Sequence, residues 1–166
     1  VTTDDFVAVM AEVSGRDLRL FRRWYTQAGT PRVTARSTFD AAAGRLRLQL
    51  EQRTPPTPGQ DTKEPLHIPL RISLVGADGD RLEARLGDGP EAQEWVLELT
   101  DAEQVFELAG LAEAPAAISW LRGFSAPVLL DAGQDTAELA HLVAHDDDAF
   151  TRWDAAQSLL RRAVIA

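Results

Sequence analysis

The residues with the clearest capacity for chemistry are two histidines four positions apart, His141 and His145. On a helix this spacing places both imidazoles on one face, where they can share a zinc ion. A zinc peptidase of the His-Glu-x-x-His type needs a glutamate directly after the first histidine as general base, and Leu142 stands there. No other histidine lies nearby in the sequence to serve as the third ligand. We therefore predict a pair of helix-surface histidines and no metal site.

Three consecutive carboxylates, Asp146 to Asp148, could suggest calcium. A calcium loop of the EF-hand type needs carboxylates at alternate positions, then a glycine, and later a bidentate glutamate. This run lacks that spacing. Negative charge is favourable at the start of a helix, where it interacts with the helix dipole. We predict that the three aspartates open the last helix of the chain.

The other candidates for catalysis have equally simple structural interpretations. His67 falls on the polar side of an alternating strand pattern, which predicts a solvent-facing or interface histidine. The serines Ser119, Ser125 and Ser158 lack the Gly-x-Ser-x-Gly context of a hydrolase nucleophile. The glycines of residues 76–80 fit a hairpin turn better than a phosphate-binding loop. We predict no catalytic, cofactor-binding or metal-binding residue in this chain.

Composition excludes several other functions. The formal net charge is −9, whereas phosphate binding requires an excess of lysine and arginine, so we expect no nucleic acid partner. The aromatic residues Phe21, Trp24 and Tyr25 could stack on bases, but in so acidic a chain they indicate packing. The absence of cysteine leaves no disulfide or thiol chemistry and fits a cytoplasmic location. No apolar run is long enough to span a membrane.

The elements that position these residues fall into three zones, and the first, residues 1–29, has a helical period. The apolar residues at helical spacing are Phe6, Val9, Met10 and Val13, and Gly15 ends this helix. Asp17 is expected to cap a second helix that ends before Gly29. Its apolar face comprises Leu18, Phe21 and Tyr25.

The second zone, residues 30–131, changes to a period of two, which is typical of strands with one buried face. The predicted strands cover residues 33–39, 46–50, 66–74, 81–86, 95–99, 104–109, 117–122 and 127–131. Turn signals such as Ala43-Gly44 and Asp78-Gly79 separate them. Short strands at this spacing predict an antiparallel β-sandwich. Pro69 inside a strand pattern indicates an edge strand or a bulge.

The third zone, residues 132–166, is helical again. Asp135 and Glu138 form a capping-box pattern at the start of a helix whose apolar stripe is Leu139, Leu142 and Val143. The last helix begins at the three aspartates. Its predicted apolar face comprises Phe150, Trp153, Gln157, Leu160 and Val164.

Three runs in this order resemble bacterial aminopeptidase N, a family of zinc-dependent peptidases of the gluzincin class. The first is Phe-Arg-Arg-Trp-Tyr-Thr-Gln-Ala-Gly-Thr-Pro, residues 21–31. The second is Gln-Arg-Thr-Pro-Pro-Thr-Pro-Gly-Gln, residues 52–60, followed by Pro-Leu-His-Ile-Pro at 65–69. The third is Phe-Thr-Arg-Trp-Asp-Ala-Ala-Gln-Ser-Leu, residues 150–159. The resemblance covers nearly the whole chain.

This resemblance implies an architecture more than a chemistry. Residues 1–29 are similar to the last helices of the catalytic domain, residues 30–131 to the immunoglobulin-like sandwich, and residues 132–166 to the first helices of the C-terminal helical domain. The parent enzymes use zinc to remove N-terminal residues, often alanine, from peptides. Their zinc ligands, glutamate base and Gly-x-Met-x-Asn segment match no residue here, and the sole methionine, Met10, lacks that context.

We therefore expect a non-catalytic segment of a longer zinc aminopeptidase that acts as a spacer between domains. Its partners would be the parent's catalytic and helical domains, with peptide substrates bound by the parent. The alternative is a stand-alone sandwich used for binding or adhesion. Amphipathic helices at both ends argue against that alternative, because a free-standing module seldom begins and ends on half-covered helices.

Overall fold

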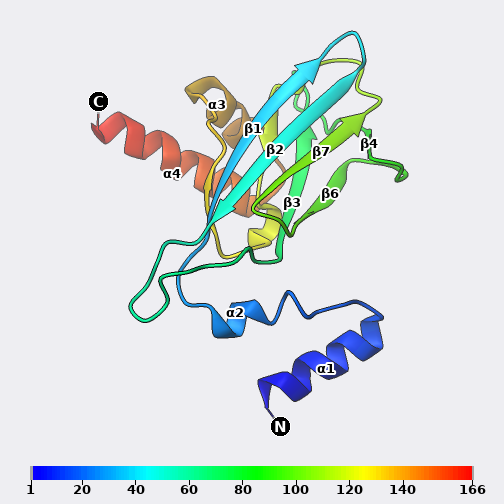
Figure 1. Cartoon of the computed structure of the whole chain (residues 1–166). Helices are drawn as coiled ribbons and strands as arrows, with labels where there is room; N and C mark the ends of the chain where they lie inside the picture. Colours follow the sequence, from blue (N-terminus) through cyan, green and yellow to red (C-terminus); the bar gives the residue numbers. More distant parts are fainter. Residues whose placement is uncertain (1, 166) are drawn as a thin grey trace.

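A computed structural model, which describes residues 2–165, confirms a β-sandwich flanked by helices (Figure 1). The helices are α1 (Thr3–Ser14), α2 (Arg23–Thr26), α3 (Thr136–His145) and α4 (Ala149–Ile165), with a short 3₁₀ turn, η1 (Arg122–Phe124). The strands are β1 (Arg32–Asp40), β2 (Arg45–Arg53), β3 (Ile68–Val75), β4 (Ala84–Leu86), β5 (Glu91–Ala92), β6 (Glu94–Leu99), β7 (Glu103–Ala109), β8 (Ala117–Ser119) and β9 (Leu129–Asp131).

The strands form two sheets. The larger has the order β5-β4-β7-β2-β1-β9 and the smaller has the order β6-β3-β8. Most neighbouring strands are antiparallel, as predicted, and β1 and β2 form a hairpin in which Ala35 lies opposite Leu50. The exception is β9, which runs parallel to β1 over three residue pairs. A parallel pair cannot be closed by a tight turn, and nearly ninety residues of chain separate these two strands.

The core lies between the two sheets and follows the predicted period of two. The inward-facing residues of the longest strands are almost fully buried: Leu46, Leu48 and Leu50 on β2, Ile68, Leu70, Ile72 and Leu74 on β3, and Leu97 and Leu99 on β6. Alternate residues of β2 point to solvent. Burial of one face of each sheet fixes the register, because a slip of one residue would expose the whole apolar set.

Pro69 lies in β3, the central strand of the smaller sheet, at a point where only one side of the strand has a neighbour. β3 pairs with β6 along Ile68–Ser73, but β8 covers only Ser73–Val75 on the other side. Proline has no N–H group to donate, so it is tolerated where one side of the strand lacks a neighbour. The edge position predicted from the sequence is therefore correct for this half of β3.

The N-terminal segment agrees only in part with the sequence prediction. Helix α1 has a capping box at Thr2 and Asp5 and ends at Gly15, whose φ of 66° is left-handed. The predicted second helix is reduced to the four residues of α2, and Asp17 does not cap it. Its carboxylate instead binds the backbone and guanidinium of Arg19. These contacts lower the pKa of Asp17 to about 2, the side-chain hydrogen bond from Arg19 being the main cause.

Helices α3 and α4 form an antiparallel pair that packs on the outside of the smaller sheet (Figure 1). The predicted capping box of Asp135 and Glu138 is present. A second small core joins the pair to the sandwich, and it contains Val75, Ala117, Leu139, Leu142 and Ala155. Among residues 2–165, no helix is both long and apolar enough to cross a bilayer.

Candidate functional site

The chain leaves β8 through a backbone turn of unusual conformation. Leu121 and Phe124 have φ values of 53° and 54°, and Gly123 between them has a φ of 62°. Left-handed backbone is unfavourable for residues other than glycine and persists where the surroundings enforce it. Here the Gly123 N–H donates to Asp148 Oδ2 at 2.9 Å. The turn carries Arg122, which the sequence analysis predicts at the end of a strand.

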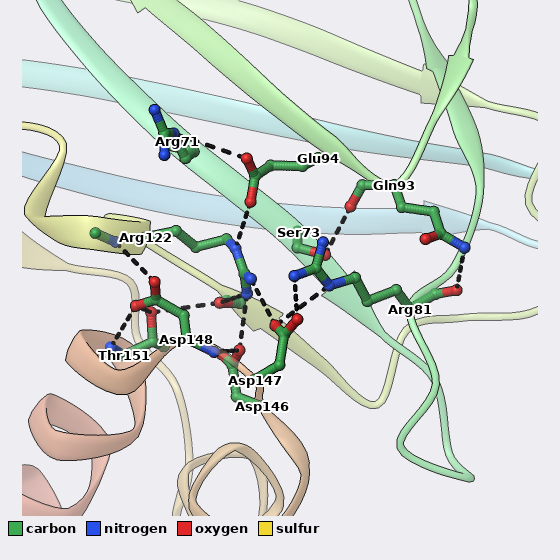
Figure 2. A network of polar contacts seen from close by, with 12 residues as sticks. Arg71, Ser73, Arg81, Gln93, Glu94, Arg122, Asp146, Asp147, Asp148 and Thr151 are labelled. Carbon is green, nitrogen blue, oxygen red and sulfur yellow. Dashed lines mark hydrogen bonds and ion pairs between the residues drawn. The ribbon is translucent and has the colours of Figure 1, made fainter.

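Arg122 is the centre of a buried polar network (Figure 2). Its Nη1 donates to Asp146 Oδ1 at 2.7 Å and to Ser119 Oγ at 2.8 Å. Its Nη2 donates to Asp147 Oδ1 at 2.6 Å, and its Nε donates to Glu94 Oε2 at 2.9 Å. One guanidinium thus connects β6, β8 and the segment between α3 and α4. Arginine suits this role because its donors have a fixed, forked geometry.

The electrostatics of this cluster favour the charged forms of Arg122 and Asp147. Burial alone would lower the pKa of Arg122, but hydrogen bonds to Asp147, Glu94 and Asp146 outweigh it and raise that pKa. Burial likewise opposes ionisation of Asp147, yet hydrogen bonds from Arg122 and Arg81 lower its pKa. Buried charges are tolerated only when they are paired in this way, and removal of one partner leaves the other charge buried and unpaired.

The three consecutive aspartates have different roles, and this corrects the prediction that all three open one helix. Asp146 is the C-cap of α3, and its side chain is fully buried against Arg122. Asp147 is more exposed and binds both Arg122 and Arg81. Only Asp148 starts the last helix, since its Oδ1 accepts from the N–H of Thr151 at 2.8 Å.

The two histidines on α3 contact the turn that follows β3, at Gly76 and Gly79. His141 Nε2 lies 2.8 Å from the carbonyl oxygen of Gly76, and the ring centroids of His141 and His145 are 4.5 Å apart. A Cβ atom on Gly79 would lie 2.4 Å from His145 Nδ1, so only glycine fits there. Within residues 2–165, no set of three potential metal-ligating side chains lies close enough to hold an ion. That the chain holds no metal stays a prediction.

The remaining sequence candidates also make structural contacts. Ser119 binds Arg122, Ser125 Oγ accepts from the N–H of Arg71 at 2.9 Å, and Ser158 Oγ accepts from Arg161 at 3.2 Å. Their contacts include no histidine that could act as a base. That no residue of this chain is catalytic stays a prediction.

His67 lies under the segment that leads from α1 to α2. Its Nε2 is buried and is 3.8 Å from Glu98 Oε2, a carboxylate that also binds Arg16. Burial, with the charge of Arg16 as a second cause, lowers the pKa of His67. Although Glu98 is close enough to favour a charged imidazole, its pairing with Arg16 weakens that effect.

A second polar join connects α2 with the proline-rich loop of residues 54–65. Trp24 Nε1 donates to the carbonyl oxygen of His67 at 2.8 Å, and Arg23 Nη1 donates to that of Pro65 at 2.6 Å. Gln27 and Glu64 exchange two hydrogen bonds. Two sequence runs that are far apart in the chain, residues 21–31 and 52–69, therefore form one interface.

Gln52 anchors the same region from inside the sandwich. It takes the inward position that continues Leu46, Leu48 and Leu50, and it is buried. Its Oε1 accepts from the N–H of Leu66 at 2.7 Å, and its Nε2 donates to the carbonyl oxygens of Leu66 at 2.8 Å and Asp101 at 3.1 Å. The buried amide thus satisfies the backbone where the loop returns to β3.

Two apolar surfaces remain uncovered on the terminal helices. On α4, the predicted face comprises Phe150, Trp153, Gln157, Leu160 and Val164 and is here called the α4 stripe. Phe150 packs against the sandwich core, whereas Trp153 is 58% exposed, Leu160 is 60% exposed and Val164 is also exposed. The α1 stripe comprises Phe6, Val9, Met10 and Val13, and all four are exposed. Thr151 and Ala155 are buried on the opposite side of α4, and Leu159 packs against the small core that Ala155 belongs to. Exposed apolar stripes of this size mark interaction surfaces.

Comparison with known proteins agrees with this architecture. A family model described as "Domain of unknown function (DUF3458) Ig-like fold" matches residues 29–133. A second model, described as "Domain of unknown function (DUF3458_C) ARM repeats", matches residues 136–166. The first covers the sandwich and the second covers α3 and α4.

The relatives are aminopeptidases. Aminopeptidase N of Escherichia coli is 42% identical over 96% of this chain and 18% of its own length, and that of Haemophilus influenzae is 41% identical over 99% and 19%. Aminopeptidase N of Caulobacter vibrioides is 43% identical over 99% and 18%. A crystal structure of Legionella pneumophila aminopeptidase A in complex with aspartic acid has the same fold, with a TM-score of 0.79 and 24% identity over 96% of this chain and 17% of that one.

The chain spans less than a fifth of the length of the curated relatives it matches. The family model confirms the predicted immunoglobulin-like fold, and the relatives confirm the predicted resemblance to aminopeptidase N. The chain belongs to the DUF3458 family of Ig-like domains, and it is homologous to the corresponding segment of bacterial aminopeptidase N.

Proposed function

We propose that this chain is a non-catalytic spacer of a longer aminopeptidase. In this proposal residues 1–29 end a catalytic domain, residues 30–131 form the sandwich, and residues 132–166 begin a helical domain. The sandwich sets the distance and orientation between the two outer domains, which are its partners. The identity of 41–43% to aminopeptidase N over nearly the whole chain supports this role.

One observation carries the proposal: polar contacts and a small apolar core join the terminal helices to the sandwich, while most of their apolar stripes stay uncovered. The Arg122 network links α3 and α4 to the smaller sheet, and Trp24 links α2 to His67, the residue before β3. A free-standing binding module has no reason to expose Phe6 or Trp153, which are 57% and 58% exposed. Surfaces of this kind are normally buried against other domains.

The longer protein, in this proposal, removes N-terminal residues such as alanine from peptides. Zinc bound in its catalytic domain would polarise the scissile carbonyl and activate a water molecule. The residues described here would contribute rigid placement of the domains around that centre. A chain without cysteine fits a reducing compartment such as the cytoplasm.

The experiment compares the 166-residue chain with the full-length protein. Alanine release from an alanyl anilide is measured together with zinc content by elemental analysis. We expect turnover and stoichiometric zinc in the full-length protein, and neither in the short chain. Turnover or stoichiometric zinc in the short chain would overturn the non-catalytic role. An inactive, zinc-free full-length protein would overturn the assignment to a zinc aminopeptidase.

A further inference from the structure

The loop that faces α2 contains the only lysine of the chain, Lys63. Every other residue of the lysine and arginine class in this sequence is arginine. The Nζ atom of Lys63 donates to the carbonyl oxygen of Ala28 at 2.8 Å, to Thr57 Oγ1 at 2.7 Å and to Gln60 Oε1 at 2.8 Å. An ammonium group has three N–H donors, so each of them has an acceptor here. We call the three acceptors the oxygen cage.

Among the described residues, the charge of Lys63 is held by neutral oxygen atoms and by no carboxylate. The adjacent carboxylate of Glu64 pairs with Arg23 instead, at 2.8 Å. Arginine could not take this position, because its donors lie in one plane, whereas those of an ammonium group point in tetrahedral directions. Neutral oxygens that converge on one positive charge are also how proteins replace the hydration shell of a potassium ion.

The oxygen cage is held in place by contacts that do not involve the ammonium group. The proline-rich loop and the chain that follows α2 lie side by side (Figure 1), and Gln60 joins them. Its Oε1 accepts from the N–H of Ala28 at 2.9 Å, and its Nε2 donates to the carbonyl oxygen of Thr26 at 2.8 Å. Thr57 and Gln60 also pair with each other as an isolated β-bridge. The cage oxygens should therefore keep their positions when the amine is removed.

We propose that the oxygen cage is a binding site for a monovalent cation of the size of potassium, and that the ammonium group of Lys63 is its resident occupant. Ammonium and potassium ions have nearly the same radius. A sodium ion is smaller, and the cage oxygens would have to move inwards to contact it. The tethered amine makes the junction of α2 with the sandwich independent of the salts in solution. The inference does not depend on the proposed function, because all the atoms of the site lie in residues 26–63.

Hydrogen–deuterium exchange of the full-length protein, followed by mass spectrometry, tests the proposal. The N–H groups of Ala28, Thr57 and Gln60 donate hydrogen bonds at this junction, so their exchange measures its opening. Lys63→Ala removes the amine and leaves its space. The matched control, Lys63→Met, fills that space with an uncharged side chain. Each protein is measured in the chlorides of potassium, ammonium, sodium and choline at equal ionic strength.

We expect these amides of Lys63→Ala to exchange about tenfold more slowly in potassium or ammonium than in sodium or choline, as for an ion present at about ten times its Kd. The wild type should exchange at one rate in every salt, because its cage is already occupied, and Lys63→Met should exchange fast in every salt. Addition of Thr57→Val to Lys63→Ala removes one cage oxygen and should abolish the potassium effect. Addition of Thr62→Val, at an exposed position of the same loop, should leave that effect intact.

Equal exchange of Lys63→Ala in every salt would overturn the inference, and so would a potassium effect that persists in Lys63→Met or without the hydroxyl of Thr57. Equal slowing by sodium and potassium would contradict a site of potassium size and would overturn it as well. Unchanged exchange of peptides from β2 and β3 shows that a variant folds. If Lys63→Ala perturbs these strands, Lys63→Ser is used for the same comparison.

Discussion

At the scale of residues, Arg122 is the side chain that joins the helix pair to the smaller sheet through polar contacts. Its guanidinium is buried with Asp146 and reaches Glu94, Ser119 and Asp147 through hydrogen bonds. A buried pair of this kind adds little net stability compared with apolar packing, but its geometry is specific. The network therefore contributes more to the position at which α4 starts than to the stability of the sandwich.

Replacement of Arg122 by alanine should be costly, because it leaves the carboxylate of Asp146 buried without its partner. We expect a loss of about 3–5 kcal/mol in the free energy of unfolding. The control is Arg45→Ala, which removes an exposed pair with Glu107 at 4.0 Å and should cost less than about 1 kcal/mol. Urea unfolding at 25 °C measures both, and equal losses would contradict the role assigned to Arg122.

His67 should make stability depend on pH. Its folded pKa lies below the ordinary value of 6.5 because burial disfavours the imidazolium. Between these two values the unfolded chain binds more protons, so stability is full above pH 6.5 and falls as the pH decreases through the folded pKa. The His67→Gln variant should show a smaller fall between pH 7 and pH 5 in urea unfolding. A fall as steep as that of the wild type would exclude His67 as its source.

The sequence allowed some of these residues to be predicted and not others. Gln52 interrupts an alternating apolar pattern on the buried side, so a buried amide could have been inferred from period alone. Arg122 gave no such signal, since a charged residue after an apolar strand normally faces solvent. Its burial depends on the left-handed turn and on carboxylates that are distant in the chain. The assignment of the three aspartates was wrong for the same reason.

At the scale of elements, the patterns with a strict period were the most predictable. Strands β1, β6 and β7 lie within one residue of their predicted bounds, and β2 continues three residues past its predicted end, because burial of one face fixes both period and register. The short strand β8 and the turn after it were predicted less well. Helix α2 was predicted too long: its sequence has helical spacing, but the tertiary contacts of Trp24 and Gln27 determine its extent.

The join between β2 and β3 should depend on the amide of Gln52. In the Gln52→Leu variant the N–H and carbonyl of Leu66 lose their partner inside the protein, and each unsatisfied group costs about 1–3 kcal/mol. The control is Gln49→Leu on the exposed face of β2, which should change stability by less than about 1 kcal/mol. Thermal unfolding of both variants provides the comparison. An equally stable Gln52→Leu protein would show that this contact is dispensable.

At the scale of the whole molecule, the chain is a β-sandwich whose terminal helices α1 and α4 expose large apolar side chains. The change of hydrophobic period near residues 30 and 132 predicted the division into three zones. It did not predict the order of the strands within the sheets. Sequence patterns predicted apolar faces on α1 and α4 that are only half covered, and most of their residues are exposed; the buried residue of α1, Val7, lies outside its predicted face. Which domains cover these faces stays a prediction, and it is the central claim of the account.

The most direct test is Trp153→Ala in the full-length protein. If the α4 stripe docks against another domain, loss of this indole should lower stability by about 3–5 kcal/mol at a well-packed site. Peptide turnover should fall because the domains are misplaced, and zinc content should stay unchanged because no zinc ligand is affected. Calorimetry, alanyl anilide turnover and elemental analysis measure the three quantities. Wild-type stability and wild-type turnover in this variant would contradict the account.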